Sequence, residues 1–317
     1  MASDQPKAKT WKILFAGSPA YAVPSLEAIH ALPECSLVGV CAQPAKPHGR
    51  GHVLQPTAVE TWAKAHNIFC LTPTTLRTPE AQAAIRALAP DVAVVVAYGK
   101  LIPADLLEML PYGWVNAHGS LLPRWRGASP IQQAILAGDT ETGVTLLKLD
   151  AGMDTGPVFA SLHVPIADDD TAPTLAEKLA RLSAQAFQEH LVPYLLGERP
   201  LQPQPVDGVT VAPILEKSDG QLHWDEPASA LCRKIRALQP WPGCTTIWNG
   251  QQLTIWKAEE IVGSAQPGLV QANGVSCTIG TAKNLLNVLE VQLAGKKRVP
   301  VDAFLRGAPG FIGTTLP

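Results

Sequence analysis

The chain has 317 residues, of which 46% are hydrophobic, and a formal net charge of −2 at pH 7. This length exceeds the size at which one core usually stops growing, so two domains are expected. No apolar run approaches the ~20 residues of a membrane span, and the first ten residues lack the apolar core of a signal peptide. A cytoplasmic protein is therefore expected.

The first part of the chain alternates short aliphatic strands with amphipathic helices, which predicts crossover connections and a parallel sheet covered on both faces. The predicted strands here are Trp11–Ala16, Leu37–Cys41, Val92–Ala97 and Trp114–Asn116. The predicted helices between them are Ala20–Leu32, Thr57–His66, Pro79–Leu88 and Pro103–Leu110. Further along, the pattern predicts a helix at Pro130–Ala137, strands at Val144–Leu149 and Val158–Val164, and a long helix at Thr174–Leu196.

The pattern changes after the long helix. Residues 197–213 are rich in proline and predict a linker. One helix is then expected at Pro227–Leu238, followed by a hairpin, since Asn249-Gly250 suits a type I′ turn. Further strands are predicted at Gly268–Ala272, Val275–Ile279 and Leu285–Leu293, and several strands at regular spacing indicate a small barrel. The expected domains are 1–196 and 214–317.

A polar constellation lies at the end of the fourth predicted strand. Asn116 and His118 are two residues apart, so their side chains point to one face, at the carboxyl end where ligands of parallel sheets bind. Asp154 follows in an Asp-Ala-Gly-Met-Asp-Thr-Gly sequence, with Asp150 as a competing carboxylate. An amide donor, an imidazole and a carboxylate are the groups needed to move an acyl group onto an amine.

Three motifs carry a family resemblance. They are Asn-x-His at 116–118, Ser-Leu-Leu-Pro-x-x-Arg-Gly at 120–127, and Asp-x-Gly-x-Asp-Thr-Gly at 150–156. In this order they resemble the folate-dependent formyltransferases that use 10-formyltetrahydrofolate, and the resemblance extends from Ile13 to Lys297. Within that superfamily the chain looks like the branch that formylates the α-amino group of methionyl initiator tRNA.

The resemblance implies a fold and a set of residue roles. It implies a Rossmann-like catalytic domain with a mostly parallel sheet and a C-terminal OB-like β-barrel that binds tRNA. It places Asn116 as the donor to the formyl oxygen and His118 with Asp154 as the proton-handling pair. The loop at Ser120, Leu121, Leu122 and Pro123, together with Gly152, would contact the folate, although the two leucines could equally belong to the core.

The resemblance also implies basic contacts to tRNA. The Pro- and Gly-rich segment 43–51 resembles an insertion that meets the acceptor stem, with Arg50 as the main candidate and Lys46 as the second. Lys296 and Lys297 belong to a basic set in the C-terminal part, where positive charge slightly exceeds negative charge. Taken singly, each of these side chains could also be plain solvated surface.

The sequence argues against other cofactors and leaves other functions open. No metal is expected, since neither the six cysteines nor the histidines show ligand spacing, and buried free thiols are expected instead. Gly17-Ser-Pro-Ala20 is not a Gly-x-Gly-x-x-Gly motif and no Walker motif occurs, so NAD and ATP are not expected. The alternatives are a formyltransferase for an amino-sugar nucleotide or a purine-pathway amine, a formyltetrahydrofolate hydrolase, and a silent RNA-binding protein. A monomer is expected.

Overall fold

The computed structural model describes residues 9–48 and 53–317, and the chain divides into two compact units. Each unit takes several stretches of the chain, so neither is one continuous segment. The first unit is formed by Met1–Gly127, Glu141–Val164 and Ala176–Val211. The second is formed by Ala128–Thr140, Pro165–Leu175 and Ala212–Pro317.

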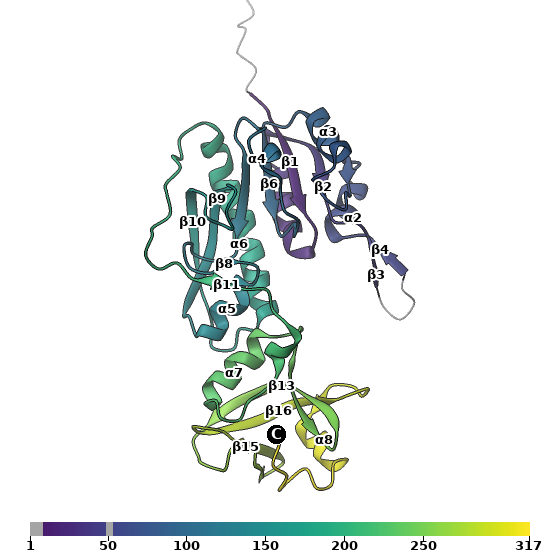
Figure 1. Ribbon diagram of the computed structural model, residues 1–317, viewed down its shortest axis with the longest axis vertical. Helices are drawn as coiled ribbons and strands as arrows, with labels where there is room; N and C mark the ends of the chain where they lie inside the picture. Colours follow the sequence, from purple (N-terminus) through teal and green to yellow (C-terminus); the bar gives the residue numbers. More distant parts are fainter. Residues whose placement is uncertain (1–8, 49–52) are drawn as a thin grey trace, which may run out of the picture. The chain divides into compact units, whose positions relative to one another are not determined.

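A seven-stranded sheet forms the centre of the first unit, in the order β10-β9-β7-β6-β1-β2-β5 (Figure 1). The pairs β1–β2, β1–β6, β6–β7 and β2–β5 are parallel, whereas β7 pairs with β9 antiparallel. The predicted α/β fold with a mostly parallel sheet is therefore confirmed. The strands are β1 Trp11–Gly17, β2 Cys35–Cys41, β5 Cys70–Leu71, β6 Val92–Val96, β7 Trp114–His118, β9 Glu141–Lys148 and β10 Val158–Pro165.

Helices between the strands cover this sheet, and their starts follow from local sequence. Thr57 and Thr78 cap two of them by accepting hydrogen bonds from Glu60 N–H and Ala81 N–H. A threonine hydroxyl at this position satisfies a backbone donor that the helix itself leaves unpaired. The elements are the 3-10 turn η1 Ala20–Ala22 and helices α1 Val23–His30, α2 Ala58–Ala65, α3 Pro79–Leu88, α4 Ala104–Leu107 and α6 Ala172–Leu195.

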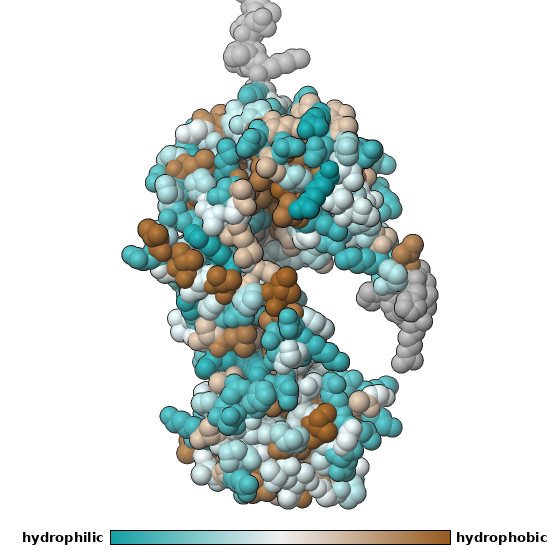
Figure 2. All heavy atoms as spheres, viewed as in Figure 1, coloured by the Kyte–Doolittle hydropathy of each residue, from teal (hydrophilic) through white to brown (hydrophobic). Residues whose placement is uncertain are grey.

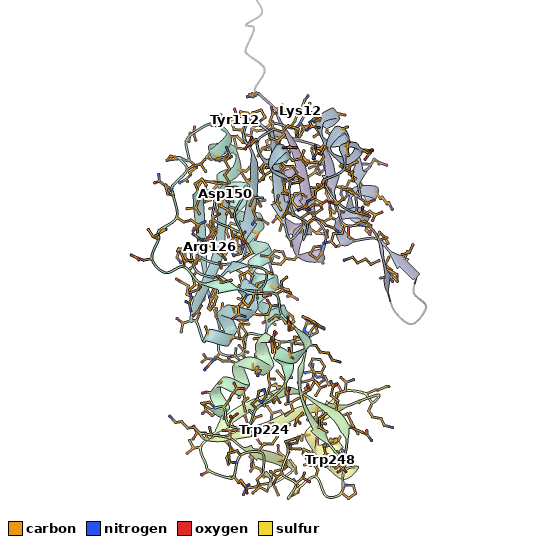
Figure 3. All side chains as sticks on the ribbon, viewed as in Figure 1. Lys12, Tyr112, Arg126, Asp150, Trp224 and Trp248 are labelled. Atoms are coloured by element: carbon orange, nitrogen blue, oxygen red, sulfur yellow. The ribbon has the colours of Figure 1, made fainter. Side chains whose placement is uncertain are left out.

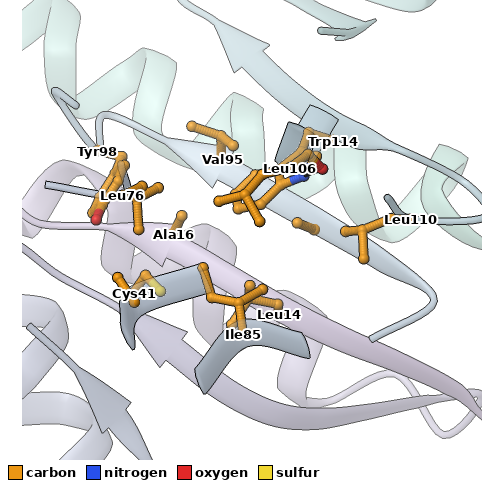
Figure 4. Packing of buried hydrophobic residues seen from close by; sticks show 12 residues of the cluster. Leu14, Ala16, Cys41, Leu76, Ile85, Val95, Tyr98, Leu106, Leu110 and Trp114 are labelled. Atoms are coloured by element: carbon orange, nitrogen blue, oxygen red, sulfur yellow. Dashed lines mark hydrogen bonds between the residues drawn. The ribbon is translucent and has the colours of Figure 1, made fainter. Parts of the chain in front are cut away.

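Aliphatic side chains from alternate strand positions fill the space between the sheet and the helices. On one face, Leu14 of β1 and Val95 of β6 pack with Ile85 of α3 and Leu106 of α4 (Figure 4). Trp114 is fully buried beside them and donates its indole N–H to the Leu106 carbonyl at 2.6 Å. This core fixes the start of β7, whose other end carries Asn116 and His118.

A short hairpin leaves the first unit after β2. Strands β3 (Lys46–His48) and β4 (Val53–Gln55) pair antiparallel, and Figure 1 shows them extending away from the helices beside the sheet. The sequence predicted only a basic Pro- and Gly-rich loop here. Residues 49–52, which include Arg50, lie outside the described residues.

The segment after α6 lies along the first unit. Gln202 pairs with Val158 of β10 in an isolated bridge, and β11 (Val211–Ala212) pairs with β8 (Arg126–Gly127). The proline-rich stretch thus makes specific backbone contacts. The domain boundaries expected at 196 and 214 stay predictions.

The second unit combines helices α5, α7 and α8 with an antiparallel sheet in the order β12-β13-β16-β15-β14, with β17 paired to β16. The predicted turn at Asn249-Gly250 is confirmed, with φ values of 46° and 72°. The elements are α5 Pro130–Ala137, the 3-10 turn η2 Lys217–Gly220, α7 Ala228–Ala237, β12 Cys244–Trp248, β13 Gln251–Ile261, β14 Val270–Asn273, β15 Ser276–Gly280, β16 Leu285–Leu293, β17 Val299–Pro300 and α8 Val301–Arg306.

Side chains of mixed hydropathy cover the face seen in Figure 2, with the exposed apolar residues in separate patches. Within residues 9–48 and 53–317, no helix has the length and apolar character needed to cross a membrane.

Candidate active site

The carboxyl end of β7 presents Asn116 and His118 on the same face of the strand. His118 is buried, with 6% of its side chain exposed, and Asn116 is partly buried. The Asn116 amide makes no hydrogen bond to any other described residue. Its two N–H donors are therefore available to a ligand.

Each ring nitrogen of His118 has an oxygen atom beside it. Nε2 is 2.8 Å from the carbonyl of Trp125, which can only accept, so Nε2 carries the proton in this contact. Nδ1 lies 3.5 Å from Oδ2 of Asp154. The structure thus brings the three residues predicted to be catalytic to the same end of β7.

Asp154 lies in the bent loop between β9 and β10, and its φ of 54° falls in the left-handed region. Aspartate tolerates this conformation better than most residues. Its Oδ2 accepts a hydrogen bond from Gly127 N–H at 2.9 Å, and 15% of the side chain is exposed. The turn aims the carboxylate at His118.

The competing carboxylate, Asp150, has a different task. Its Oδ1 accepts hydrogen bonds from Gly152 N–H at 3.0 Å and from the Thr155 hydroxyl at 2.7 Å. A Cβ on Gly152 would meet Thr155 Oγ1 at 2.0 Å, and a Cβ on Gly156 would meet the Lys148 carbonyl at 1.8 Å. Asp150 and the two glycines therefore shape the turn that carries Asp154.

The loop expected to contact folate is held by buried polar contacts. The Ser120 hydroxyl is fully buried and donates to the Arg124 carbonyl at 2.6 Å, while Leu122 N–H donates to Thr145 Oγ1 at 3.1 Å. Ser120 therefore shapes the loop from inside. Leu121, Leu122 and Pro123 are partly buried, and Gly152 is exposed, so their surfaces remain open to a ligand.

Sequence reasoning missed two residues from the proline-rich segment. The Gln204 amide donates to the carbonyls of Asp154 and Gly156 and accepts from Arg126, whose guanidinium is labelled in Figure 3. Thr210 accepts from Trp125 N–H at 2.8 Å. A single glutamine in a proline-rich stretch has no periodic pattern, so no sequence signal marked it.

The basic residues expected to meet tRNA are only partly described. Lys46 is exposed at the base of the hairpin, and its ammonium donates to Gln43 Oε1 at 2.8 Å. Lys296 and Lys297 are exposed on the turn between β16 and β17. In the part of the chain that the structure describes, no group of three or more His, Cys, Asp or Glu side chains could hold a metal ion.

Known protein families match both parts of the chain. Residues 12–191 match the formyl transferase family, and residues 214–309 match the formyl transferase C-terminal domain. The chain belongs to the formyl transferase family.

Two relatives that match over nearly their whole length are methionyl-tRNA formyltransferases. The chain is 44% identical to the methionyl-tRNA formyltransferase of Dechloromonas aromatica, covering 95% of this chain and 97% of that protein. It is 45% identical to the methionyl-tRNA formyltransferase of Myxococcus xanthus, covering 94% and 96% respectively.

Solved structures share the fold at lower identity. The methionyl-tRNA formyltransferase from Clostridium thermocellum superimposes with a TM-score of 0.57 at 17% identity, covering 90% of this chain and 99% of that one. An N-formyltransferase from Helicobacter canadensis, solved with folinic acid and dTDP-3-aminofucose, gives a TM-score of 0.64 at 18% identity, covering 88% and 99%. At these identities the likeness concerns the fold alone.

Proposed function

We propose that this protein transfers the formyl group of 10-formyltetrahydrofolate to the α-amino group of methionyl initiator tRNA in the cytoplasm, giving N-formylmethionyl-tRNA for translation initiation. The observation that carries the proposal is the meeting of Asn116, His118 and Asp154 at one end of β7. The near full-length similarity to methionyl-tRNA formyltransferases supports the choice of acceptor.

The reaction exchanges one carbon–nitrogen bond for another. The neutral amine of the methionyl group attacks the formyl carbon, and the carbonyl becomes a tetrahedral oxyanion. The bond from carbon to N10 of the folate then breaks, and N10 takes up one proton while the amine gives one up. The enzyme must therefore stabilise an oxyanion and carry a proton.

Asn116 supplies the first requirement. Its amide, which hydrogen-bonds to no other described residue, can donate to the formyl oxygen as negative charge develops there, and such a donor placed in advance contributes about 2.7–4 kcal/mol to catalysis. His118 lies on the same face of the strand, and it would approach the formyl oxygen only by giving up one of its two present ring contacts.

His118 and Asp154 supply the second requirement. Imidazole exchanges protons near neutral pH, and the carboxylate at 3.5 Å from Nδ1 stabilises the protonated ring. Active-site contacts of this length often shorten when substrate binds.

The proposal also assigns residues to the binding of folate and tRNA. The loop Ser120–Pro123 and the turn at Gly152 would receive the folate, and Lys46, Arg50, Lys296 and Lys297 would meet tRNA phosphates. Basic side chains bind nucleic acid by releasing counterions from the phosphates.

The direct test mixes the purified protein with 10-formyltetrahydrofolate and one acceptor at a time. Formylated product with methionyl initiator tRNA, and none with free methionine or an amino-sugar nucleotide, is the expected result. Formate released from the donor without any acceptor would instead identify a hydrolase. Formylation of the amino-sugar nucleotide alone would replace the proposed acceptor.

A further inference from the structure

The segment Gln204–Thr210, here called the clamp segment, contacts both loops that hold the His118 ring. Building on the proposed function, we propose that Gln204 and Thr210 are positioning residues for the formyl transfer. Gln204 holds Asp154 against Nδ1, and Thr210 holds the Trp125 carbonyl against Nε2. Neither side chain touches the ring itself.

Every polar position of the Gln204 amide is used. Nε2 donates to the carbonyls of Asp154 at 2.7 Å and Gly156 at 2.8 Å. Oε1 accepts from Nε and Nη2 of Arg126 at 3.0 and 2.7 Å. A carboxamide has two N–H donors and one carbonyl oxygen with two lone pairs, so only an amide satisfies this set of partners.

The turn that Gln204 holds is strained. Asp154 has a φ of 54°, a conformation that persists only when its surroundings determine it. The two hydrogen bonds from Gln204 fix a carbonyl at Asp154 and another at Gly156, two residues further on. They thereby fix the direction in which the Asp154 carboxylate leaves the backbone.

Thr210 performs the matching task on the other side of the ring. Its hydroxyl accepts from Trp125 N–H at 2.8 Å, and its carbonyl accepts from Arg126 N–H at 2.9 Å. Trp125 is also left-handed, with a φ of 63°, and its carbonyl is the acceptor for His118 Nε2. Both acceptors of the catalytic ring thus belong to left-handed residues that the clamp segment holds.

This arrangement has a kinetic consequence. Misplacing a catalytic group by about 1 Å can cost about a hundredfold in rate even when the group itself is intact. Loosening the clamp segment should therefore lower kcat while leaving the binding of both substrates nearly unchanged.

The variant Gln204→Glu tests the two amide N–H donors, because it removes them and keeps an acceptor oxygen. The glutamate oxygen can still accept from Arg126, but the amide donors are absent and a carboxylate faces two carbonyls. The matched control is Gln202→Glu, because the Gln202 side chain makes no hydrogen bond to another described residue and lies two positions before the clamp segment. We expect Gln204→Glu to lower kcat about 10- to 100-fold with KM values within about twofold, and the control to keep normal kcat.

A double-mutant cycle separates positioning from general damage to the fold. If Gln204 acts through Asp154, Gln204→Glu should change the residual rate of the Asp154→Ala enzyme less than twofold. Thr210→Val keeps the side-chain shape and removes the hydroxyl, and it should be silent in a His118→Ala enzyme. Full kcat in Gln204→Glu, or an undiminished effect in the Asp154→Ala background, would overturn the proposal.

A measurement that does not depend on turnover completes the test. The ¹⁵N NMR signals of the His118 ring should shift in Gln204→Glu and stay unchanged in Gln202→Glu. If the wild-type protein formylates no acceptor, the proposed function fails, but these signals still show whether Gln204 positions the ring. Identical His118 signals in the two variants would refute the positioning role even in an active enzyme.

Discussion

His118 has an oxygen atom at each ring nitrogen. The contact from Nε2 to the Trp125 carbonyl is short, at 2.8 Å, and the one from Nδ1 to Asp154 is longer, at 3.5 Å. A neutral imidazole carries one N–H and satisfies one of them, whereas the protonated ring satisfies both. The ring therefore lies between two acceptor oxygens, one at each nitrogen.

The three polar residues at the end of β7 should be essential for chemistry. We expect Asn116→Ala, His118→Ala and Asp154→Ala each to lower kcat by at least about a hundredfold, the scale for loss of an oxyanion donor. His163→Ala is the control, because that histidine is exposed and pairs with Glu141. Near-normal kcat in Asp154→Ala would reject its assignment and return attention to Asp150.

The left-handed backbone at Asp154 predicts an order of stability between two inactive variants. Glycine adopts a positive φ without steric cost, whereas alanine does not. Both variants remove the hydrogen bond to Gly127, so the comparison isolates the backbone. We expect Asp154→Gly to be about 1 kcal/mol more stable than Asp154→Ala in urea unfolding. Equal stabilities would mean that the turn relaxes when the carboxylate is removed.

At the scale of elements, periodic patterns and local capping signals predicted most helices and strands, but α4 spans only Ala104–Leu107 where Pro103–Leu110 was expected, and β5 was not predicted. The helices Pro79–Leu88 and Pro130–Ala137 and the strand Leu285–Leu293 have the bounds expected from sequence, since first-turn prolines mark helix starts. The hairpin β3–β4 was not predicted, because Pro47 and the surrounding glycines indicate a loop. The pairing there depends on two strands that are too short to show alternation.

The candidate site was predictable only in part, for a physical reason. Asn116 and His118 share a strand, so the two-residue spacing alone places their side chains on a common face. Gln204 reaches Asp154 from fifty positions along the chain, through hydrogen bonds that leave no local pattern. Long-range contacts of single polar side chains follow from tertiary folding and not from periodicity.

The basic segment 43–51 should matter for tRNA and not for folate. Removing one contact between a basic side chain and a phosphate should flatten the log–log salt dependence of binding by roughly one unit. We expect Arg50→Ala to raise KM for methionyl-tRNA and reduce its salt sensitivity, with KM for the folate donor unchanged. Steady-state kinetics at three salt concentrations would measure both effects.

The control for Arg50→Ala is Arg86→Ala on α3, where the guanidinium donates to Gln82 on the same helix. It removes the same charge from the first unit at a site with no proposed contact to RNA. If Arg50→Ala and Arg86→Ala behave alike, the segment 43–51 is a solvated connection. One of the arguments for tRNA as the acceptor is then lost.

At the scale of the whole molecule, the cysteines should report on unfolding. Burial raises the pKa of the Cys41, Cys244 and Cys277 thiols to about 12, so the reactive thiolate is scarce at pH 8. We expect alkylation of these three by iodoacetamide at pH 8 to be at least about a hundredfold slower in the native protein than in denaturant. Mass spectrometry of labelled peptides would measure it, and rapid native labelling would show that these regions open readily.

Each unit is built from several separate stretches of the chain, and this limits which parts can be exchanged between related proteins. The second unit includes α5 and the start of α6, where Arg233 donates to the Leu136 carbonyl at 3.1 Å and Arg236 to the Asp170 carbonyl at 2.8 Å. In a chimaera that joins two relatives anywhere in 197–213, these arginines would come from one relative and their carbonyl acceptors from the other. Exchange between distant relatives should therefore succeed only when residues 128–140 and 165–175 are transferred together with the C-terminal sheet. Residues 214–317 alone do not form a unit that can be exchanged between relatives.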